Sequence, residues 1–169
     1  MPDPRRAYAA LGIGGLALAL GATIALDPSP RLVWNPSESA PRGLYAVRPH
    51  APLRRGDFVL AWAPPHARDL AARRGYLPRN VPLIKRVAAL PGDRVCARGS
   101  MILVNGRPVA ARREGDRAGR PLPAWHGCAR LRPGMLLLLM PHPDSFDGRY
   151  FGPSTSASLV GRAEPLWVR

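Results

Sequence analysis

The sequence predicts a mainly β fold that follows one apolar N-terminal helix. Three observations lead to this prediction. The chain has 169 residues, which suits one domain of ordinary size and leaves no room for a second. It contains 21 prolines and 17 glycines, and few stretches place apolar residues at helical spacing. One long uncharged segment stands near the N-terminus, and short apolar runs broken by turn residues follow it.

The uncharged segment covers residues 7 to 26 and is 20 residues long. At about 1.5 Å per residue, a helix of this length spans roughly 30 Å, the hydrocarbon thickness of a bilayer. We therefore expect a transmembrane anchor. Arg5 and Arg6 precede it, so the positive-inside rule predicts a cytoplasmic N-terminus over residues 1 to 6 and an exported domain over residues 27 to 169.

A cleaved signal peptide is the alternative to a retained anchor. Residues 17 to 19 read Ala-Leu-Ala, which fits a cleavage site, but the apolar run continues past them to Leu26. We favour the anchor. It implies a lipid bilayer as a partner, with the domain on the outer face of the membrane.

After the anchor, short elements joined by turns are expected. Residues 27 to 36 resemble a proline-bounded link, and residues 111 to 123 an exposed loop. The only soluble helical pattern lies at residues 64 to 76, and Asn105-Gly106 between two apolar arms predicts a hairpin. Strands are expected at 43–47, 53–62, 81–93, 134–141 and 159–168.

The formal net charge is +14, from 25 basic and 11 acidic residues. Such a charge raises the question of nucleic-acid binding, but the basic residues are scattered and no stretch alternates them with aromatic residues. We therefore expect a solvated basic surface, with some attraction to anionic lipid, and no nucleic-acid partner. Lys85 is the only lysine in the chain.

Cys96 and Cys128 are the only cysteines. In an exported domain such a pair is typical of a disulfide. Two thiols with His126 nearby fall short of the four ligands of a structural zinc site, so the sequence predicts no metal site and no cofactor.

A serine nucleophile near neutral pH needs a base to take its proton. The four histidines lie in proline-rich or turn-like surroundings without an evident carboxylate to orient them, so a Ser-His-Asp triad has little support. A neutral lysine is the alternative base. If residues 83 to 87 form a strand, Lys85 shares a face with Leu83 and Val87.

Burial between aliphatic neighbours lowers the pKa of a lysine. Lowering it from about 10.4 to about 7 costs roughly 4.6 kcal/mol, which suggests that a lysine held in this way is used. The competing interpretation is that the stem of Lys85 lies on the apolar face while its ammonium reaches water. Arginine, which is always charged, could serve a surface role but not as a base.

The motifs NPSESAPRGLY, GDFVL, KRVAALPGD and SFDGRYFGP occur in this order after the apolar segment. Together they resemble the conserved boxes of the signal peptidase I superfamily of Ser/Lys peptidases, from Asn35 to the C-terminus. The first box is most similar to the TraF-like conjugative transfer peptidases. The resemblance implies a signal-peptidase-like, β-rich catalytic domain over residues 27 to 169.

The resemblance also assigns roles to single residues. It implies that Ser39 is the nucleophile, Lys85 the general base, and Ser37 a hydroxyl donor that forms the oxyanion hole with the backbone N–H of Ser39. Glu38, between the serines, must then point outward, because it would otherwise raise the pKa of Lys85. A common polar turn is the competing interpretation of this segment.

In SFDGRYFGP the resemblance implies that Ser145 orients the lysine. It implies that Asp147 and Arg149 pair to hold the turn. An exposed loop ion pair worth at most about 1 kcal/mol would explain Asp147 and Arg149 equally well.

The implied activity is that of a membrane-anchored serine endopeptidase which cuts exported precursor proteins after small residues, with the maturation of conjugative pilin precursors, and their cyclisation in some systems, as the leading case. A general signal peptidase I that removes secretory signal peptides is the second reading. A LexA-like self-cleaving regulator should carry a DNA-binding domain where this chain has an apolar segment. The non-enzyme alternative is a membrane-anchored assembly protein of a transfer channel.

Overall fold

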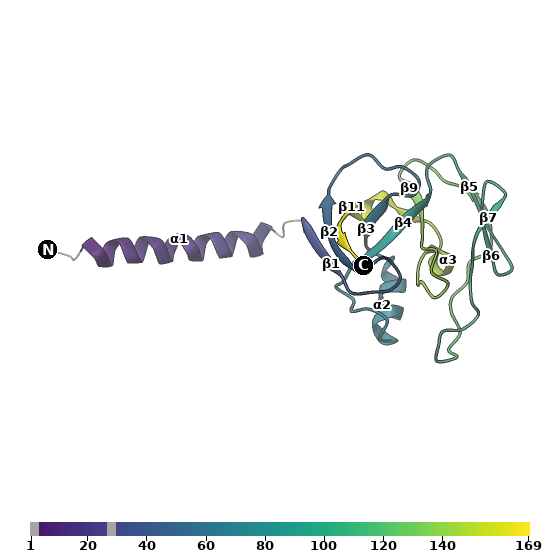
Figure 1. The fold of residues 1–169 in the computed structure, drawn as a ribbon, viewed down its shortest axis with the longest axis horizontal. Helices are drawn as coiled ribbons and strands as arrows, with labels where there is room; N and C mark the ends of the chain where they lie inside the picture. Colours follow the sequence, from purple (N-terminus) through teal and green to yellow (C-terminus); the bar gives the residue numbers. More distant parts are fainter. Residues whose placement is uncertain (1–3, 27–29) are drawn as a thin grey trace. The chain divides into compact units, whose positions relative to one another are not determined.

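The computed structural model describes residues 4–26 and 30–169, and the chain divides into two units with the boundary after Pro30 (Figure 1). The first unit contains helix α1, Pro4–Leu26. The second unit, residues 31–169, contains two β-sheets, two short α-helices and one 3-10 helix. The β-rich domain predicted from the sequence is therefore confirmed.

Helix α1 covers the apolar segment of residues 7 to 26. Its described large apolar side chains are 58% to 79% exposed; they are Tyr8, Leu11, Ile13, Leu16, Leu18 and Leu20. Among the residues that the structure describes, however, no helix has both the length and the apolar character needed to cross a bilayer. The helix is confirmed, whereas its predicted role as a membrane span is not.

The larger sheet of the second unit has the strand order β1-β2-β11-β3-β4-β9-β10, and the smaller sheet has the order β7-β6-β5-β8. Neighbouring strands are antiparallel in both sheets. The strands are β1 Leu32–Asn35, β2 Gly43–Arg48, β3 Phe58–Ala61, β4 Leu83–Ala89, β5 Arg94–Arg98, β6 Met101–Val104, β7 Arg107–Ala111, β8 Gly127–Arg130, β9 Met135–Leu139, β10 Ser154–Thr155 and β11 Leu159–Val168. The helices are α2 Pro65–Arg73, α3 Gly148–Phe151 and the 3-10 helix Ser156–Ser158.

The central strands of the large sheet are buried on both faces, so successive side chains enter different apolar clusters. On β3, Leu60 packs in a cluster with Tyr45, whereas Val59 packs in a cluster with Leu138. Both β3 residues are fully buried. These strands therefore form a rigid frame on which single polar side chains can be held in place.

Most expected elements are confirmed. Strands β2, β3, β4, β9 and β11, the hairpin between β6 and β7, and helix α2 all fall where the sequence predicts them. The hairpin turn has positive φ at Asn105 and at Gly106, as its type I′ geometry requires. The loop expected at residues 111 to 123 carries only a single isolated bridge, Gly115 to Pro121.

Two local expectations are wrong. Residues 27 to 36 are not only a link, because Leu32–Asn35 forms β1 and pairs with β2, with Leu32 opposite Ala46 and Asn35 opposite Gly43. The segment SFDGRYFGP is not only a turn, because Gly148–Phe151 forms the short helix α3.

The small sheet contains the disulfide between Cys96 on β5 and Cys128 on β8, which stand directly opposite each other. Several of its apolar residues pack against the large sheet: Val95 and Ile102 lie in one cluster with Leu137 of β9. Figure 1 shows β5, β6 and β7 as a separate layer beside the large sheet. The disulfide thus joins two strands within this layer.

Candidate active site

The segment NPSESAPRGLY forms a turn that connects β1 and β2. The buried side chain of Asn35 holds this turn: its amide nitrogen donates to the carbonyl oxygens of Ser37 at 3.1 Å, Ala40 at 3.1 Å and Pro41 at 3.0 Å. Its amide oxygen accepts from the backbone N–H of Ser37 at 3.2 Å. Ala40 is buried in the apolar cluster below the turn. The side chain of Asn35 therefore holds the backbone on both sides of Ser39.

Within this turn the two serines face each other. The Oγ atoms of Ser37 and Ser39 lie 2.7 Å apart, and the backbone N–H of Ser39 donates to Ser37 Oγ at 3.2 Å. The hydroxyl of Ser37 and the backbone N–H of Ser39 thus lie within hydrogen-bonding distance of each other. This is where two donors for an oxyanion are expected.

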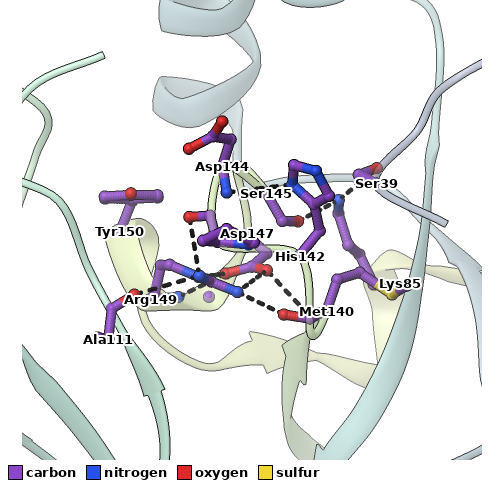
Figure 2. A network of polar contacts seen from close by, with 12 residues as sticks. Ser39, Lys85, Ala111, Met140, His142, Asp144, Ser145, Asp147, Arg149 and Tyr150 are labelled. Carbon is purple, nitrogen blue, oxygen red and sulfur yellow. Dashed lines mark hydrogen bonds and ion pairs between the residues drawn. The ribbon is translucent and has the colours of Figure 1, made fainter. Parts of the chain in front are cut away.

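Lys85 lies on β4, in the middle of the large sheet, directly opposite Val59 of β3. The residue is only 2% exposed. Its Nζ lies 3.3 Å from Ser39 Oγ and donates to Ser145 Oγ at 2.8 Å. The structure therefore brings Ser39, Lys85 and Ser145 together, although they are far apart in the sequence (Figure 2). The competing interpretation, an ammonium that reaches water, does not describe this side chain.

Burial lowers the pKa of Lys85 from 10.5 to about 8. The negative charge of Asp147 opposes this change, and the positive charge of Arg149 adds to it. Because the two charges act in opposite directions, desolvation decides the result. With this pKa roughly a tenth of the lysine is neutral at pH 7, far more than for an ordinary lysine, and a proton acceptor must be neutral.

Ser145 is held by the segment that leads into α3. It is 1% exposed, and its backbone N–H donates to the carbonyl oxygen of His142 at 3.1 Å. Asp147 caps the N-terminus of α3 by accepting from the backbone N–H of Arg149 at 3.1 Å. Its other carboxylate oxygen accepts from the backbone N–H of Met140 at 2.9 Å. This pair of contacts fixes the start of the helix against the end of β9.

Asp147 and Arg149 form a buried ion pair, with Nε 2.8 Å from Oδ1 and side-chain exposures of 0% and 2%. The guanidinium also donates to the backbone carbonyl oxygens of Ala111, Met140 and Pro143 (Figure 2). The interpretation as an exposed loop pair is therefore wrong. The pair stabilises the segment that carries Ser145.

A cavity of about 450 Å³ opens beside Ser39 and Lys85. Residues from α2 and from the loop at 111 to 123 line it, together with aromatic side chains such as Tyr76 and Phe146. Glu38 pairs with Arg42 at 2.7 Å, and the two side chains are 65% and 57% exposed. Glu38 lines the cavity, but its exposed carboxylate is held by Arg42 and is not among the charges that shift the pKa of Lys85, as the resemblance requires. A cavity of this size accommodates an extended peptide segment.

Not every residue singled out in the sequence lies at this site. Cys96 and Cys128 do not line the cavity; they belong to the small sheet. Within the described residues no cluster of three or more His, Cys, Asp or Glu side chains could hold a metal ion. Asn35 is the important residue that sequence reasoning missed. Its position directly before the Pro-Ser turn was the available signal, since asparagine is typical of turns.

The family profile described as signal peptidase, peptidase S26, matches residues 5–168. The chain belongs to the peptidase S26 signal peptidase family. This S26 chain is 36% identical to a conjugal transfer protein TraF of Agrobacterium fabrum, over 94% of this chain and 93% of that protein. It is 35% identical to a plasmid transfer protein TraF of Escherichia coli, over 96% of both chains.

A third similar protein is a probable conjugal transfer protein TraF of Sinorhizobium fredii, which is 33% identical over 92% of this S26 chain and 87% of that protein. Among solved structures, a signal peptidase I of Enterococcus faecalis matches 66% of this chain and 97% of that chain. Its sequence identity is 22% and the TM-score is 0.38. The recognition of TraF-like S26 peptidases from the sequence motifs is thus confirmed.

Proposed function

We propose that this protein is a serine endopeptidase with a Ser39/Lys85 dyad that cleaves exported precursor proteins after small residues. The observation that carries the proposal is the fully buried amine of Lys85 within 3.3 Å of the Ser39 hydroxyl. Membership of the S26 family supports a peptidase. The names of the relatives, conjugal and plasmid transfer proteins, support a precursor used in conjugation, for which we propose a pilin.

The reaction would begin when neutral Lys85 accepts the proton of Ser39 and the Ser39 oxygen attacks the scissile carbonyl. Ser145 takes no direct part in bond formation or proton transfer. Its hydroxyl contacts Lys85 Nζ at 2.8 Å and keeps the amine aimed at Ser39. The protonated lysine then returns its proton to the leaving amine.

The tetrahedral oxyanion would be held by the backbone N–H of Ser39 and the hydroxyl of Ser37. Without substrate, Ser37 Oγ accepts the N–H at 3.2 Å and lies 2.7 Å from Ser39 Oγ. An oxyanion placed between the two donors would replace these contacts. In a site of this kind a single donor contributes about 100- to 1000-fold in rate.

The acyl-enzyme would be resolved by water or by an amine. If the amine is the N-terminus of the same pilin, the product is a ring. A linear product is one water heavier than the ring, so the mass of the processed pilin distinguishes them.

We also propose that α1 holds the protein at the bacterial inner membrane, with residues 31–169 on the periplasmic face. The exposed apolar side chains of α1 support this. So do the exposed rings of Trp34 and Trp167, whose centroids lie 5.9 Å apart, with the guanidinium of Arg169 over Trp167. Tryptophan beside a basic residue is typical of the membrane surface. Recovery of the full chain in the soluble fraction after cell lysis would contradict this proposal.

The direct test is co-expression of the full chain with a pilin precursor from a conjugative system. We expect the wild type to convert the precursor to a shorter product and Ser39→Ala to leave it uncut. The comparison is made by mass spectrometry of the precursor. Equal processing by both proteins would sink the proposal and favour the non-enzyme alternative.

The rate of cleavage should depend on pH through Lys85. Because its pKa is lowered to about 8 and only the neutral amine accepts a proton, kcat/KM is expected to rise about tenfold per pH unit up to roughly pH 7 and to level off above about pH 8. The measurement is kcat/KM for one quenched peptide between pH 5.5 and 9.5. A plateau already at pH 6, or a rise that continues toward 10.5, would contradict the assignment of Lys85 as the base.

A further inference from the structure

The active-site cavity is lined by more positive than negative side chains. The arginines are Arg68, Arg74, Arg113, Arg117 and Arg120, and the carboxylates are Glu38, Asp116 and Asp144. Glu38 is paired with Arg42, which does not line the cavity. The two aspartates are therefore the only cavity carboxylates that can neutralise these arginines.

Four of the five arginines form ion pairs with these two aspartates. Arg74 lies 3.6 Å and Arg120 2.7 Å from Asp116, which also accepts a hydrogen bond from the hydroxyl of Tyr76. Two further arginines share one carboxylate in ion pairs of 2.9 Å each: Arg113 and Arg117 with Asp144. Structural ion pairs thus account for four guanidinium groups.

Arg68 is the exception. It lies on α2, and its Nε is a buried atom without a hydrogen-bond partner. In the part of the chain that the structure describes, its guanidinium forms no ion pair. The group lies over the ring of Trp62, 5.3 Å from the centroid. The adjacent carboxylate of Asp69 is not its partner, because Asp69 forms an ion pair with Arg79 at 2.8 Å.

A buried donor without an acceptor costs free energy, and stacking on Trp62 leaves that donor unsatisfied. A guanidinium presents a planar fork of donors that matches a carboxylate with two parallel hydrogen bonds. Each aspartate is shared by two arginines, so neither group is fully neutralised, but Arg68 is the only one of the five cavity arginines without an ion pair among the described residues. A negatively charged group bound in the cavity would pair with the charge of Arg68; because Nε is buried, such a group would have to contact the terminal nitrogens of the guanidinium.

We propose that Arg68 binds a carboxylate of the substrate peptide and thereby selects precursors that carry a negative charge near the cleavage site. The inference rests on the proposed peptidase function, since Arg68 lines the same cavity as Ser39 and Lys85. The carboxylate has two sources, an acidic side chain or the C-terminus of a short segment behind the cut. Arg68 would act as a specificity determinant and take no part in proton transfer.

The experiment measures kcat/KM of the full chain in detergent for quenched peptides with alanine before the cut. Glutamate and glutamine are compared at each position on either side of the cut, and a free C-terminal carboxylate is compared with an amide. We expect wild type to prefer the charged member of one pair by about tenfold or more. The position of that pair identifies which source of carboxylate is used.

In Arg68→Gln this ratio should fall to about one. The matched control is Arg73→Gln, which removes the same charge from an exposed position on the same helix and should keep the wild-type ratio. Arg68→Met, which keeps an apolar stem against Trp62, provides a second variant if glutamine disturbs folding. It should also lose the ratio.

Two results would overturn the inference while leaving the peptidase intact. One is cleavage by wild type with equal kcat/KM for every charged and uncharged pair. The other is a ratio that persists in both Arg68→Gln and Arg68→Met, which would assign the recognition to another arginine. If wild type cleaves neither the peptides nor a precursor, the proposed function itself fails and the inference fails with it.

Discussion

Lys85→Met is expected to abolish cleavage, lowering kcat/KM by at least about 1000-fold, because the only group that can take the proton of Ser39 is removed. The variant should nevertheless fold, since methionine fills the buried space on β4 between β3 and β9 without a charge. The readouts are peptide cleavage and circular dichroism. Residual cleavage near the wild-type rate would show that Lys85 is not the base.

The same variant tests the burial of the amine through stability. The folded-state pKa of Lys85 is about 8 and lies below the ordinary value of 10.5, so the unfolded state binds more protons between these values and wild-type stability rises with pH there. Below pH 8 the folded state is destabilised by the full free-energy cost of burying the protonated amine, about 3 kcal/mol. Relative to Lys85→Met, the free energy of unfolding of wild type should therefore increase by about 3 kcal/mol from pH 8 to 10.5.

The measurement is urea unfolding of both proteins at several pH values. Titration of other groups cancels in the difference between the two curves. The exposed Arg73→Gln serves as the control, because it removes a positive charge without removing a buried amine. Parallel curves for wild type and Lys85→Met would mean that the ammonium is solvated.

Asp147→Asn is expected to destabilise the domain by about 3 to 5 kcal/mol, the cost of leaving a buried charge without its partner. The substitution keeps the size of the side chain but leaves the buried guanidinium of Arg149 uncompensated. It also places an amide where Oδ2 accepts from the backbone N–H of Met140. The measurement is the free energy of unfolding in urea at neutral pH.

The matched control for this variant is Asp144→Asn, three positions away. Asp144 also pairs with arginines, but the two guanidinium groups are 57% and 76% exposed, so the loss of stability should be much smaller than for Asp147→Asn. Equal losses in the two variants would mean that the Asp147–Arg149 pair is no more important than a surface pair. Because Ser145 stands between these aspartates, cleavage by Asp147→Asn should fall as well.

The buried position of Lys85 could be predicted from the sequence because its signal is local, whereas the role proposed for Ser39 came only from the resemblance. Alternation along 83–87 placed Lys85 among aliphatic neighbours, and the structure holds its amine beside Ser39. The turn at Asn105-Gly106 was equally predictable, because only a few residue types accept its backbone geometry.

The parts that failed depend on distant contacts. Strand β1 follows two prolines and has no strong pattern of its own; it exists because β2 returns beside it. The resemblance predicts the pairing of Asp147 with Arg149, and the structure contains this ion pair. The burial of the pair is not predictable from its spacing, because it depends on the carbonyl groups of Ala111 and Met140, which belong to other segments. Helix α3 is too short for a helical pattern and is stabilised by its cap.

The order of strands in the large sheet has a consequence for synthesis. Ser39 lies on the hairpin of β1 and β2, and Lys85 lies on β4, but the strand that joins the two is β11. A ribosome-bound chain that has emerged only as far as residue 158 contains both reactive groups and lacks the strand that hydrogen-bonds the hairpin to β3. Such a nascent chain has no main-chain ladder to align them, so proteolytic competence would arise only after β11 has been synthesised.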